Sequence, residues 1–237
     1  VGTDLIPAEL VFGNPSFLRP CHGIVPPRGV FLHNYAADLA RAPNGDWWVI
    51  ADRTQAPSGA GYALENRMVS ARTLPLVLDE CRVEPLHGFF EATINALFTL
   101  APPQGREPRV VVMTAGPNSE TYFEHSFFAR QWDFPLVSGD DLTVRDGHVY
   151  LKTLAGLNPV DVILRRLDDE YCDPLELRGD SLLGVPGLLQ AVRAGNVCVA
   201  NALGSGLVES PALMAFLPAL SRHLLGEPLR MPSVATW

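Results

Sequence analysis

The segment RVVVMTAGPNSETYFEHSFFARQWDFPLV, residues 109–137, contains three parts with different patterns. Residues 109–113 form a short continuous apolar run, which is typical of a strand that is covered on both faces. Residues 116–119 (GPNS) interrupt the chain and supply a helix-capping residue type, so we expect a helix over 120–131. Residues 135–137 are suited to a second strand. The segment therefore predicts a strand–helix–strand unit.

The alternation of strands and helices continues beyond this segment. The expected elements are strands at 160–164 and 196–200, helices at 185–193 and 210–225, and an inserted hairpin made of residues 141–145 and 148–152. Strands that alternate with helices favour a mostly parallel sheet. We therefore predict a Rossmann-like domain with an inserted hairpin over residues 106–237.

The first part of the chain has a different pattern. β-branched and aromatic residues at 30–39 and 47–52 flank the turn sequence Pro43-Asn44-Gly45, so a β-hairpin is expected there. Two helices are expected after it, at 62–72 and 86–100. We expect these elements to form a segment of their own, residues 1–105, and the whole chain to be an α/β protein.

Composition excludes several classes of protein. Apolar residues make up 47% of the 237 residues, which is enough for a buried core. The formal net charge of -8 argues against a general surface for nucleic acid or anionic membranes. The chain has a single lysine, Lys152, which follows Leu151, so the Gly-Lys-Ser/Thr run of a P-loop is absent. Because no segment approaches the length of an apolar membrane span, we expect a cytoplasmic protein.

Polar side chains gather in the segment DRTQAPSGAGYALENR, residues 52–67. A simple connection between a strand and a helix does not need so many polar groups around a glycine loop, so a functional loop is one interpretation. A capped and salt-bridged turn is the other. The candidates in this segment are Asp52, Arg53, Ser58, Gly59, Glu65, Asn66 and Arg67.

A second polar group follows the strand expected at 160–164. It consists of Arg165, Arg166, Asp168 and Asp169, at the carboxyl end of that strand, where open α/β sheets place their ligands. Arginine recognises carboxylates through paired hydrogen bonds, so binding of a substrate carboxylate is one interpretation. An internal Arg–Asp network that orders the following loop is the alternative. Glu120 and Glu124 are explained by attraction to a helix N-terminus.

Six motifs together resemble one protein family. They are DRTQAPSGAGYALENR at 52–67, ELVFGNP at 9–15, ETYFEH at 120–125, GDDLTVR at 139–145, ILRRLDD at 163–169 and GVPGL at 184–188. In their order along the chain, these motifs closely resemble those of the bacterial circularly permuted ATP-grasp proteins, relatives of glutathionylspermidine synthetase. The resemblance covers essentially the whole chain. It implies that residues 1–105 are a partial ATP-grasp lobe, followed by the Rossmann-like domain.

The resemblance implies an ATP-dependent carboxylate–amine ligase, which forms an amide or peptide bond with ATP and Mg²⁺. In the permuted family, the lysines that hold the nucleotide come last. Because this chain has only Lys152, begins with Val1 and ends with Trp237, we expect it to be the front half of a longer protein, with no ATP or Mg²⁺ bound to it. A non-catalytic binding or scaffolding protein that keeps the fold is the alternative.

The resemblance also identifies a metal-binding hairpin. In active ATP-grasp proteins an Asp on its first strand, here Asp38, faces a Glu-x-Asn pair on the second. Sister branches carry Glu-Asp-Asn where this chain has Ala51-Asp52-Arg53. With a two-residue turn at Asn44-Gly45, Asp38 faces Ala51 and has Arg53 diagonally beside it, which predicts an Asp38–Arg53 ion pair in place of Mg²⁺. A three-residue turn at 43–45 would instead bring Asp38 and Asp52 together.

The candidates are Arg53, Arg67, Arg165 and Arg166 for catalysis, Ser58, Gly59, Glu65, Asn66, Asp168 and Asp169 for substrate binding, and Asp38 and Asp52 for metal in a site that has lost ligands. The expected partners are small-molecule or peptide carboxylate and amine substrates and a helical partner domain, with no nucleic acid and no membrane. Uncovered apolar surface is expected to favour self-association.

Overall fold

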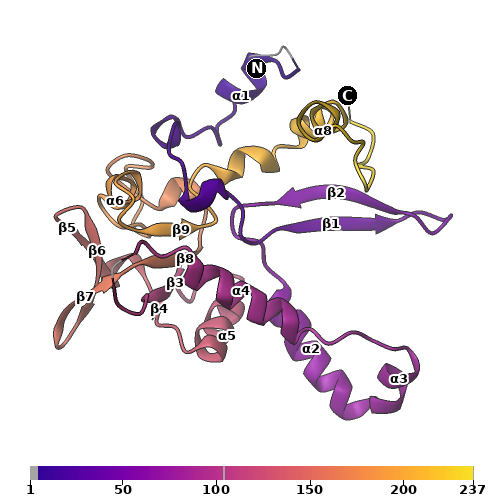
Figure 1. Ribbon diagram of the computed structural model, residues 1–237, viewed down its shortest axis with the longest axis horizontal. Helices are drawn as coiled ribbons and strands as arrows, with labels where there is room; N and C mark the ends of the chain where they lie inside the picture. The colour runs from indigo at the N-terminus through magenta and orange to yellow at the C-terminus, as the bar shows by residue number, and fades with distance from the viewer. Residues whose placement is uncertain (1–4, 104, 237) are drawn as a thin grey trace.

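A four-stranded parallel sheet forms the centre of the structure, a computed structural model that describes residues 5–103 and 105–236 (Figure 1). Its strand order is β4 (Leu136–Val137), β3 (Val110–Thr114), β8 (Val162–Arg166) and β9 (Cys198–Ala200), and each neighbouring pair is parallel. The predicted α/β class and parallel sheet are confirmed. Val1 and Trp237, from which a longer protein is expected, lie outside the described residues.

Helices lie on both sides of this sheet and also extend away from it (Figure 1). In the described ranges they are α1 (Ala8–Phe12), α2 (Ala60–Thr73), α3 (Pro75–Glu80), α4 (His87–Thr99), α5 (Tyr122–Trp132), α6 (Leu188–Arg193), α7 (Pro211–Met214) and α8 (Leu217–Leu225). Short 3-10 turns lie at Arg19–Cys21, Pro27–Gly29, Gly139–Asp141, Asp169–Tyr171 and Ser205–Glu209. The single helix expected over 210–225 is wrong: it is divided at Ala215 and Phe216, and Pro218, which has no N–H to donate, is the second residue of α8.

Apolar side chains cover both faces of the sheet. Val111 and Met113 of β3 pack into a cluster that includes Leu188 of α6. Val110 and Val112 belong to a second cluster with residues of α4 and α5. Successive residues of a strand point to opposite faces. The continuous apolar run of β3 is therefore explained by burial on both sides.

The inserted hairpin is a three-stranded antiparallel sheet. Its strands are β5 (Leu142–Arg145), β6 (His148–Thr153) and β7 (Gly156–Val160). The sequence predicts the first two and misses β7. Residues of β7 include Gly156 and Pro159, two residue types that are rare in strands, which is why its pattern is weak.

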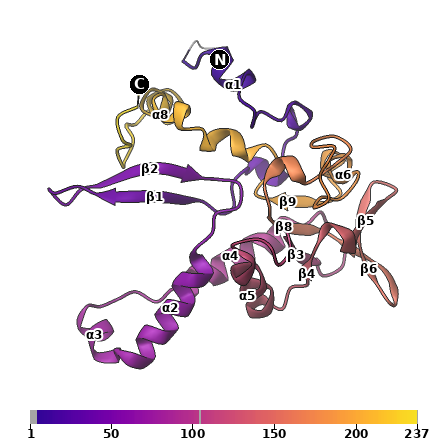
Figure 2. The same ribbon diagram turned by 180° about the vertical axis from the view of Figure 1, so that it is seen from behind.

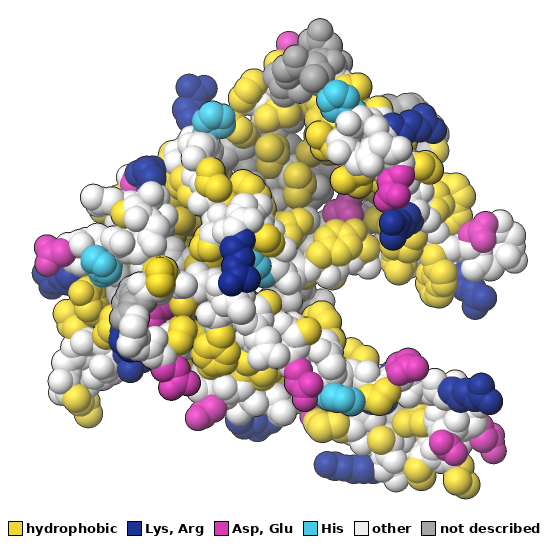
Figure 3. Space-filling model, viewed as in Figure 1, with side chains coloured by type: hydrophobic (Ala, Val, Ile, Leu, Met, Phe, Trp, Pro, Cys, Tyr) yellow, Lys and Arg dark blue, Asp and Glu magenta, His cyan; other side chains and the backbone are white. Residues whose placement is uncertain are grey.

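The first hairpin, formed by β1 (Ala36–Arg41) and β2 (Trp47–Arg53), projects from the sheet, and α2 and α3 project beside it (Figures 1 and 2). A wide gap separates these two projections in the space-filling view (Figure 3). The strand expected from residue 30 begins only at Ala36, because the amides of His33 and Asn34 bond to Asn201 instead of a neighbouring strand. The base of the first hairpin is thus attached to the end of β9.

Candidate functional site

The base of the first hairpin carries an ion pair. Asp38 lies opposite Ala51, and the Arg53 guanidinium donates to one Asp38 oxygen from Nη2 at 2.6 Å and from Nε at 3.2 Å. Both side chains are about half exposed, 53% for Arg53 and 50% for Asp38. The hydrogen bond and the charge of Asp38 raise the pKa of Arg53 above its ordinary value. The predicted Asp38–Arg53 ion pair is confirmed.

The turn of this hairpin differs from the predicted one, although the pairing of Asp38 is the same. Ala42 N–H donates to Asp46 at 2.8 Å, so the turn has three residues, with Gly45 at a φ of 94°. A bulge at Ile50 then shifts the pairing by one residue, between Leu39 opposite Val49 and Asp38 opposite Ala51. The two-residue turn is therefore wrong, whereas the pairing expected from it is confirmed.

The second acidic candidate of the hairpin lies apart from the first. Asp52 pairs with Ala37, whose side chain faces away from that of Asp38, and the Tyr35 hydroxyl donates to the Asp52 carboxylate at 2.6 Å. Burial, and then the hydrogen bond to Asp52, raise the pKa of Tyr35 to about 12. In the described ranges, no three His, Cys, Asp or Glu side chains gather as metal ligands. Mg²⁺ needs several oxygens in a near-octahedral set, so the hairpin residues do not fit this ion.

Asn201 holds the base of the first hairpin to β9 (Cys198–Ala200). Its Oδ1 accepts from the amides of His33 at 2.7 Å and Asn34 at 2.9 Å. Its Nδ2 donates to the carbonyls of Asn34 at 2.7 Å and Thr54 at 2.6 Å. One buried side chain thus connects the residues just before β1 and just after β2.

Glu209 makes a second attachment at the end of β2. One carboxylate oxygen accepts from the amides of Thr54 at 2.5 Å and Gln55 at 2.7 Å. Gln55 in turn accepts from the amide of Asp169 at 2.9 Å. The loop after β2 is therefore joined both to the 3-10 turn Ser205–Glu209 and to the loop after β8.

The guanidinium of Arg165 is buried and bonds to groups inside the protein. It is 1% exposed, and it donates to the carbonyls of Asn201 and Leu167 at 3.0 and 2.8 Å and to Ser205 Oγ at 2.8 Å. It also pairs with Asp169, whose carboxylate accepts from the Gly206 amide at 2.8 Å. For Arg165 and Asp169, the geometry favours the internal network over a substrate-binding role. Asp168 is exposed and lines a pocket of about 290 Å³ with Gln55; partial removal of its carboxyl group from water raises its pKa.

Arg166 has different surroundings from its neighbour. Its Nη2 donates to Glu124 of α5 at 3.1 Å, and the two side chains are 3% and 0% exposed. The other Glu124 oxygen accepts from the amide of Gly59 at 2.5 Å, so the pair is joined to the glycine loop before α2. Burial lowers the pKa of Arg166 and raises that of Glu124, and in each case the partner's charge opposes the shift. Sequence reasoning explains Glu124 by the helix N-terminus alone and misses this contact.

A small pocket opens where these segments meet. It has a volume of about 90 Å³ and is lined by Arg166, by Asn34, Tyr35 and Ala36 at the hairpin base, by Pro57, Ser58 and Ala60 of the glycine loop, and by Phe89, Thr93, Phe128, Trp132 and Leu164. Phe128 and Trp132 stack with their ring centroids 4.7 Å apart. The structure thus brings two sequence candidates, Ser58 and Arg166, to one cavity.

The remaining candidates of the 52–67 segment lie on α2. Arg67 donates to the Glu84 carbonyl at 2.5 Å, and so connects α2 to the segment after α3. Asn66 is exposed, and its carbonyl oxygen accepts from Ser70 at 3.5 Å. Glu65 is half-buried on the same helix. None of the described hydrogen bonds or ion pairs joins these three side chains to Arg166 or Asp38.

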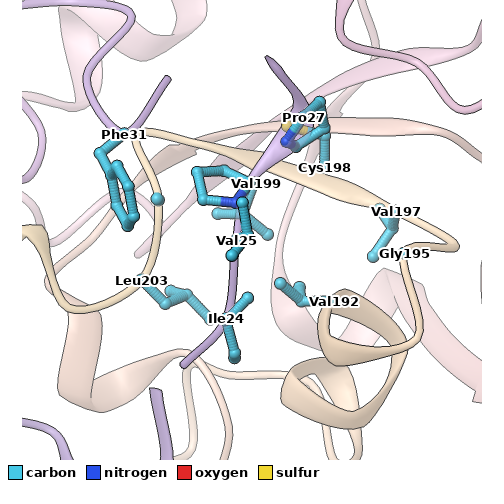
Figure 4. A pocket seen from close by; sticks show the side chains of 12 residues that line it. Ile24, Val25, Pro27, Phe31, Val192, Gly195, Val197, Cys198, Val199 and Leu203 are labelled. Atoms are coloured by element: carbon cyan, nitrogen blue, oxygen red, sulfur yellow. The ribbon is translucent and has the colours of Figure 1, made fainter. Parts of the chain in front are cut away.

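A separate apolar pocket lies against β9 and α6. It has a volume of about 190 Å³, and Ile24, Val25, Phe31, Val192 and Leu203 are among its lining side chains (Figure 4). Of the residues that line it, Cys198 is the only one with an ionisable side chain, and burial raises the pKa of its thiol to about 12. This pocket therefore offers apolar contact but no group for acid–base chemistry.

Comparison with known proteins identifies the family. The family model described as circularly permuted ATP-grasp type 2 matches residues 1–237. The chain belongs to this family. An uncharacterised protein of Synechocystis is 42% identical over all 237 residues of the chain, which cover 49% of the relative. Two uncharacterised proteins of Mycobacterium tuberculosis are 44% and 40% identical over 98% of the chain, which matches 26% and 42% of their lengths.

The chain spans about half or less of the length of the relatives it matches, and the printed names of these relatives state no activity. Within the described residues, no helix has the length and apolar character needed to span a membrane. The family is therefore shown, whereas the substrates, the partners and the cytoplasmic location remain predictions.

Proposed function

We propose that this chain provides part of an ATP-dependent ligase that joins a carboxylate to an amine. Membership of the circularly permuted ATP-grasp family is the observation that carries the proposal, because ATP-grasp proteins generally use ATP and Mg²⁺. The pocket that contains Arg166 and Ser58 supports it, since an arginine and a hydroxyl are suited to bind an acid substrate. In this proposal the protein has the length of the longer relatives, and ATP would supply the activation of the acid.

The role of the first hairpin in this proposal is limited by its chemistry. The Arg53 guanidinium is hydrogen-bonded to the Asp38 carboxylate, and Asp52 lies on the other face of the hairpin. We propose that this hairpin has lost its metal site and that a built-in cation replaces the charge of the ion. The relation to glutathionylspermidine synthetase is likewise part of the proposal.

A second function is favoured by the same ion pair. If the hairpin does not hold Mg²⁺, the fold can persist as a binding or scaffolding protein without ligase chemistry. The glycine loop, fixed to Glu124 through Gly59, would then present its surface to a peptide or protein partner. The helical partner domain expected from the resemblance suits either function.

Release of ADP separates the two functions. The protein is incubated with ATP, with and without Mg²⁺, and with mixtures of amino acids and short peptides. The ligase predicts ADP release that depends on an added acid and an added amine together. ATP turnover that is absent under every condition, with binding of peptide retained, would establish the non-catalytic function instead.

A further inference from the structure

The pocket at the base of the first hairpin contains buried donors without acceptors. Arg166 lines the pocket and is 5% exposed, and its Nε has no hydrogen-bond partner. Trp132 also lines the pocket, and its buried indole Nε1 has no partner either. Buried N–H groups are nearly always paired in folded proteins. Two such donors at one cavity therefore point to an acceptor that the protein itself does not supply.

The surroundings of these donors specify the acceptor. Arg166 uses Nη2 for Glu124, so its Nε remains for a second, anionic partner. The lining also includes Ser58, whose hydroxyl can donate, and it contains no acidic side chain. Glu124, which bonds to Arg166, is not part of the lining and also accepts from the Gly59 amide. A carboxylate has two oxygens that accept hydrogen bonds from such donors, and its charge suits a guanidinium.

The aromatic side chains that line the pocket indicate what the apolar part of the ligand is. Phe128 and Trp132 form a stacked pair, and the Arg166 guanidinium lies 5.8 Å from the Phe128 ring. Phe89, half exposed, lies at the same pocket and leaves its ring accessible. Aromatic and aliphatic walls bind apolar groups, while the few polar groups set orientation.

We propose that this pocket binds an organic carboxylate that carries an aromatic group, with Arg166 as the carboxylate-binding residue and Phe89, Phe128 and Trp132 as the walls. The identification of this ligand as the acid that is joined to an amine rests on the proposed function, whereas the binding itself does not. Arg165, which the sequence places beside Arg166 as an equal candidate, takes no part, because its donors are used inside the protein.

Titration with 3-phenylpropionate in the absence of ATP tests the proposal, with binding followed by calorimetry. Two matched compounds separate the two halves of the ligand: 3-phenylpropanol lacks the charge, and acetate lacks the ring. We expect each to bind at least about tenfold more weakly than 3-phenylpropionate. N-acetylphenylalanine distinguishes the two sources of the carboxylate, since tighter binding of this compound indicates the end of a peptide and weaker binding indicates a free acid. Equal binding of 3-phenylpropionate and 3-phenylpropanol would overturn the proposal.

Variants locate the site. Arg166→Lys keeps a positive charge beside Glu124 but removes Nε, and we expect it to weaken 3-phenylpropionate binding at least about tenfold. Phe89→Ala changes a half-exposed wall and is expected to fold normally, with binding weakened several-fold. Arg130→Lys, an exposed residue of α5, is the control and should bind as the wild type does. Wild-type binding by Phe89→Ala, or by a folded Arg166→Lys, contradicts the proposal. Because the titration contains no ATP, it tests the pocket alone; binding of 3-phenylpropionate together with no ADP release in the separate incubations with ATP would refute the ligase and leave the pocket assignment standing.

Discussion

At the scale of single residues, the first hairpin carries an ion pair at the position where the resemblance implies a metal ligand. Arg53 reaches Asp38 because the two lie diagonally on one face, and the residue opposite Asp38 is Ala51, which carries no carboxylate. An exposed ion pair of this kind adds at most about 1 kcal/mol to stability. We therefore propose that its role is to take the place of a metal ion rather than to add stability.

Restoring an acidic face should restore metal binding. The double variant Ala51→Glu/Arg53→Asn places a carboxylate opposite Asp38 and removes the guanidinium. We expect it to bind Mn²⁺, a spectroscopic substitute for Mg²⁺, at least about tenfold more tightly than the wild type. Electron paramagnetic resonance measures this directly. Ala51→Gln/Arg53→Asn is the control, and Mn²⁺ binding by the wild type that Asp38→Asn abolishes would contradict the interpretation.

Asn201 is the residue whose loss should most affect the hairpin base. Asn201→Leu leaves two amides and two carbonyls without their partner, and we expect it to lower the free energy of unfolding by about 2–4 kcal/mol. Urea unfolding gives the value. Asn158→Leu, which removes one bond of 3.2 Å to Thr153 from a strand of the inserted hairpin, should cost less than about 1 kcal/mol. Similar costs for both variants would show that Asn201 is an ordinary polar residue.

At the scale of elements, the position of α2 depends on a close approach to α5. A Cβ at Gly61 would lie 2.9 Å from Glu124 Cγ and 3.3 Å from Phe127 Cδ1. Glycine is therefore required at this point for α2 to begin where Gly59 contacts Glu124. The two buried groups at this contact, Glu124 and Arg166, connect the start of α2 to the end of β8.

Two glycine substitutions test this approach. Gly61→Ala is expected to destabilise the protein by about 1–3 kcal/mol, because α2 or α5 must move. Gly88→Ala changes a helical glycine of α4 that has open space around it, and should raise stability by up to about 1 kcal/mol through helix propensity. Thermal unfolding compares the two variants. Gly61→Ala that unfolds like Gly88→Ala would refute the close packing of α2 on α5.

At the scale of the whole molecule, pH dependence reports on the buried polar centre. His125 is 1% exposed between Thr114 and Thr121, with ring nitrogens 2.8 and 2.9 Å from their hydroxyl oxygens. Burial, and then the charge of Arg166, lower the pKa of His125 from 6.5 to about 4. The unfolded chain therefore binds a proton below pH 6.5 that the folded protein does not bind.

The free energy of unfolding should fall accordingly as the pH is lowered from about 6.5 to about 4, by at most about 3 kcal/mol from His125. Glu124, whose pKa is raised by burial, acts in the opposite sense and is present in both proteins when His125→Gln is compared with the wild type. Urea unfolding at several pH values should show a smaller decrease for His125→Gln. His223→Gln, on α8, is the control, and an unchanged slope in His125→Gln would contradict the assignment.

The projecting α2 and α3 leave apolar side chains uncovered. Leu74, Leu76 and Val77 are 55%, 76% and 50% exposed. We expect self-association that rises with protein concentration in sedimentation velocity, because neighbouring exposed apolar groups favour contact. Leu76→Glu should shift the protein towards monomer, whereas Leu154→Glu, at the tip of the inserted hairpin, should not. A wild type that stays monomeric at high concentration would contradict this expectation.

The sequence predicts the parallel sheet well, because runs such as residues 110–114 are buried on both faces and their pattern is local. It predicts the Asp38–Arg53 pair from strand alternation. It misses Asn201 and the role of Glu124, since their partners lie 167 and 65 residues away at Asn34 and Gly59, and no local pattern contains that information. It also leaves open whether Arg165 or Arg166 faces a cavity, because both lie at the end of one strand and their surroundings come from α5 and the Ser205–Glu209 turn.

The bulge at Ile50 makes the two ends of the first hairpin independent of each other. A three-residue turn with this bulge and a two-residue turn without it lead to the same partner for Asp38. A substitution at Pro43 or Asn44 that changes the turn can therefore change which residue of β2 lies opposite Leu39, now Val49, without moving Arg53. Changes at the tip are thereby separated from the chemistry at the base.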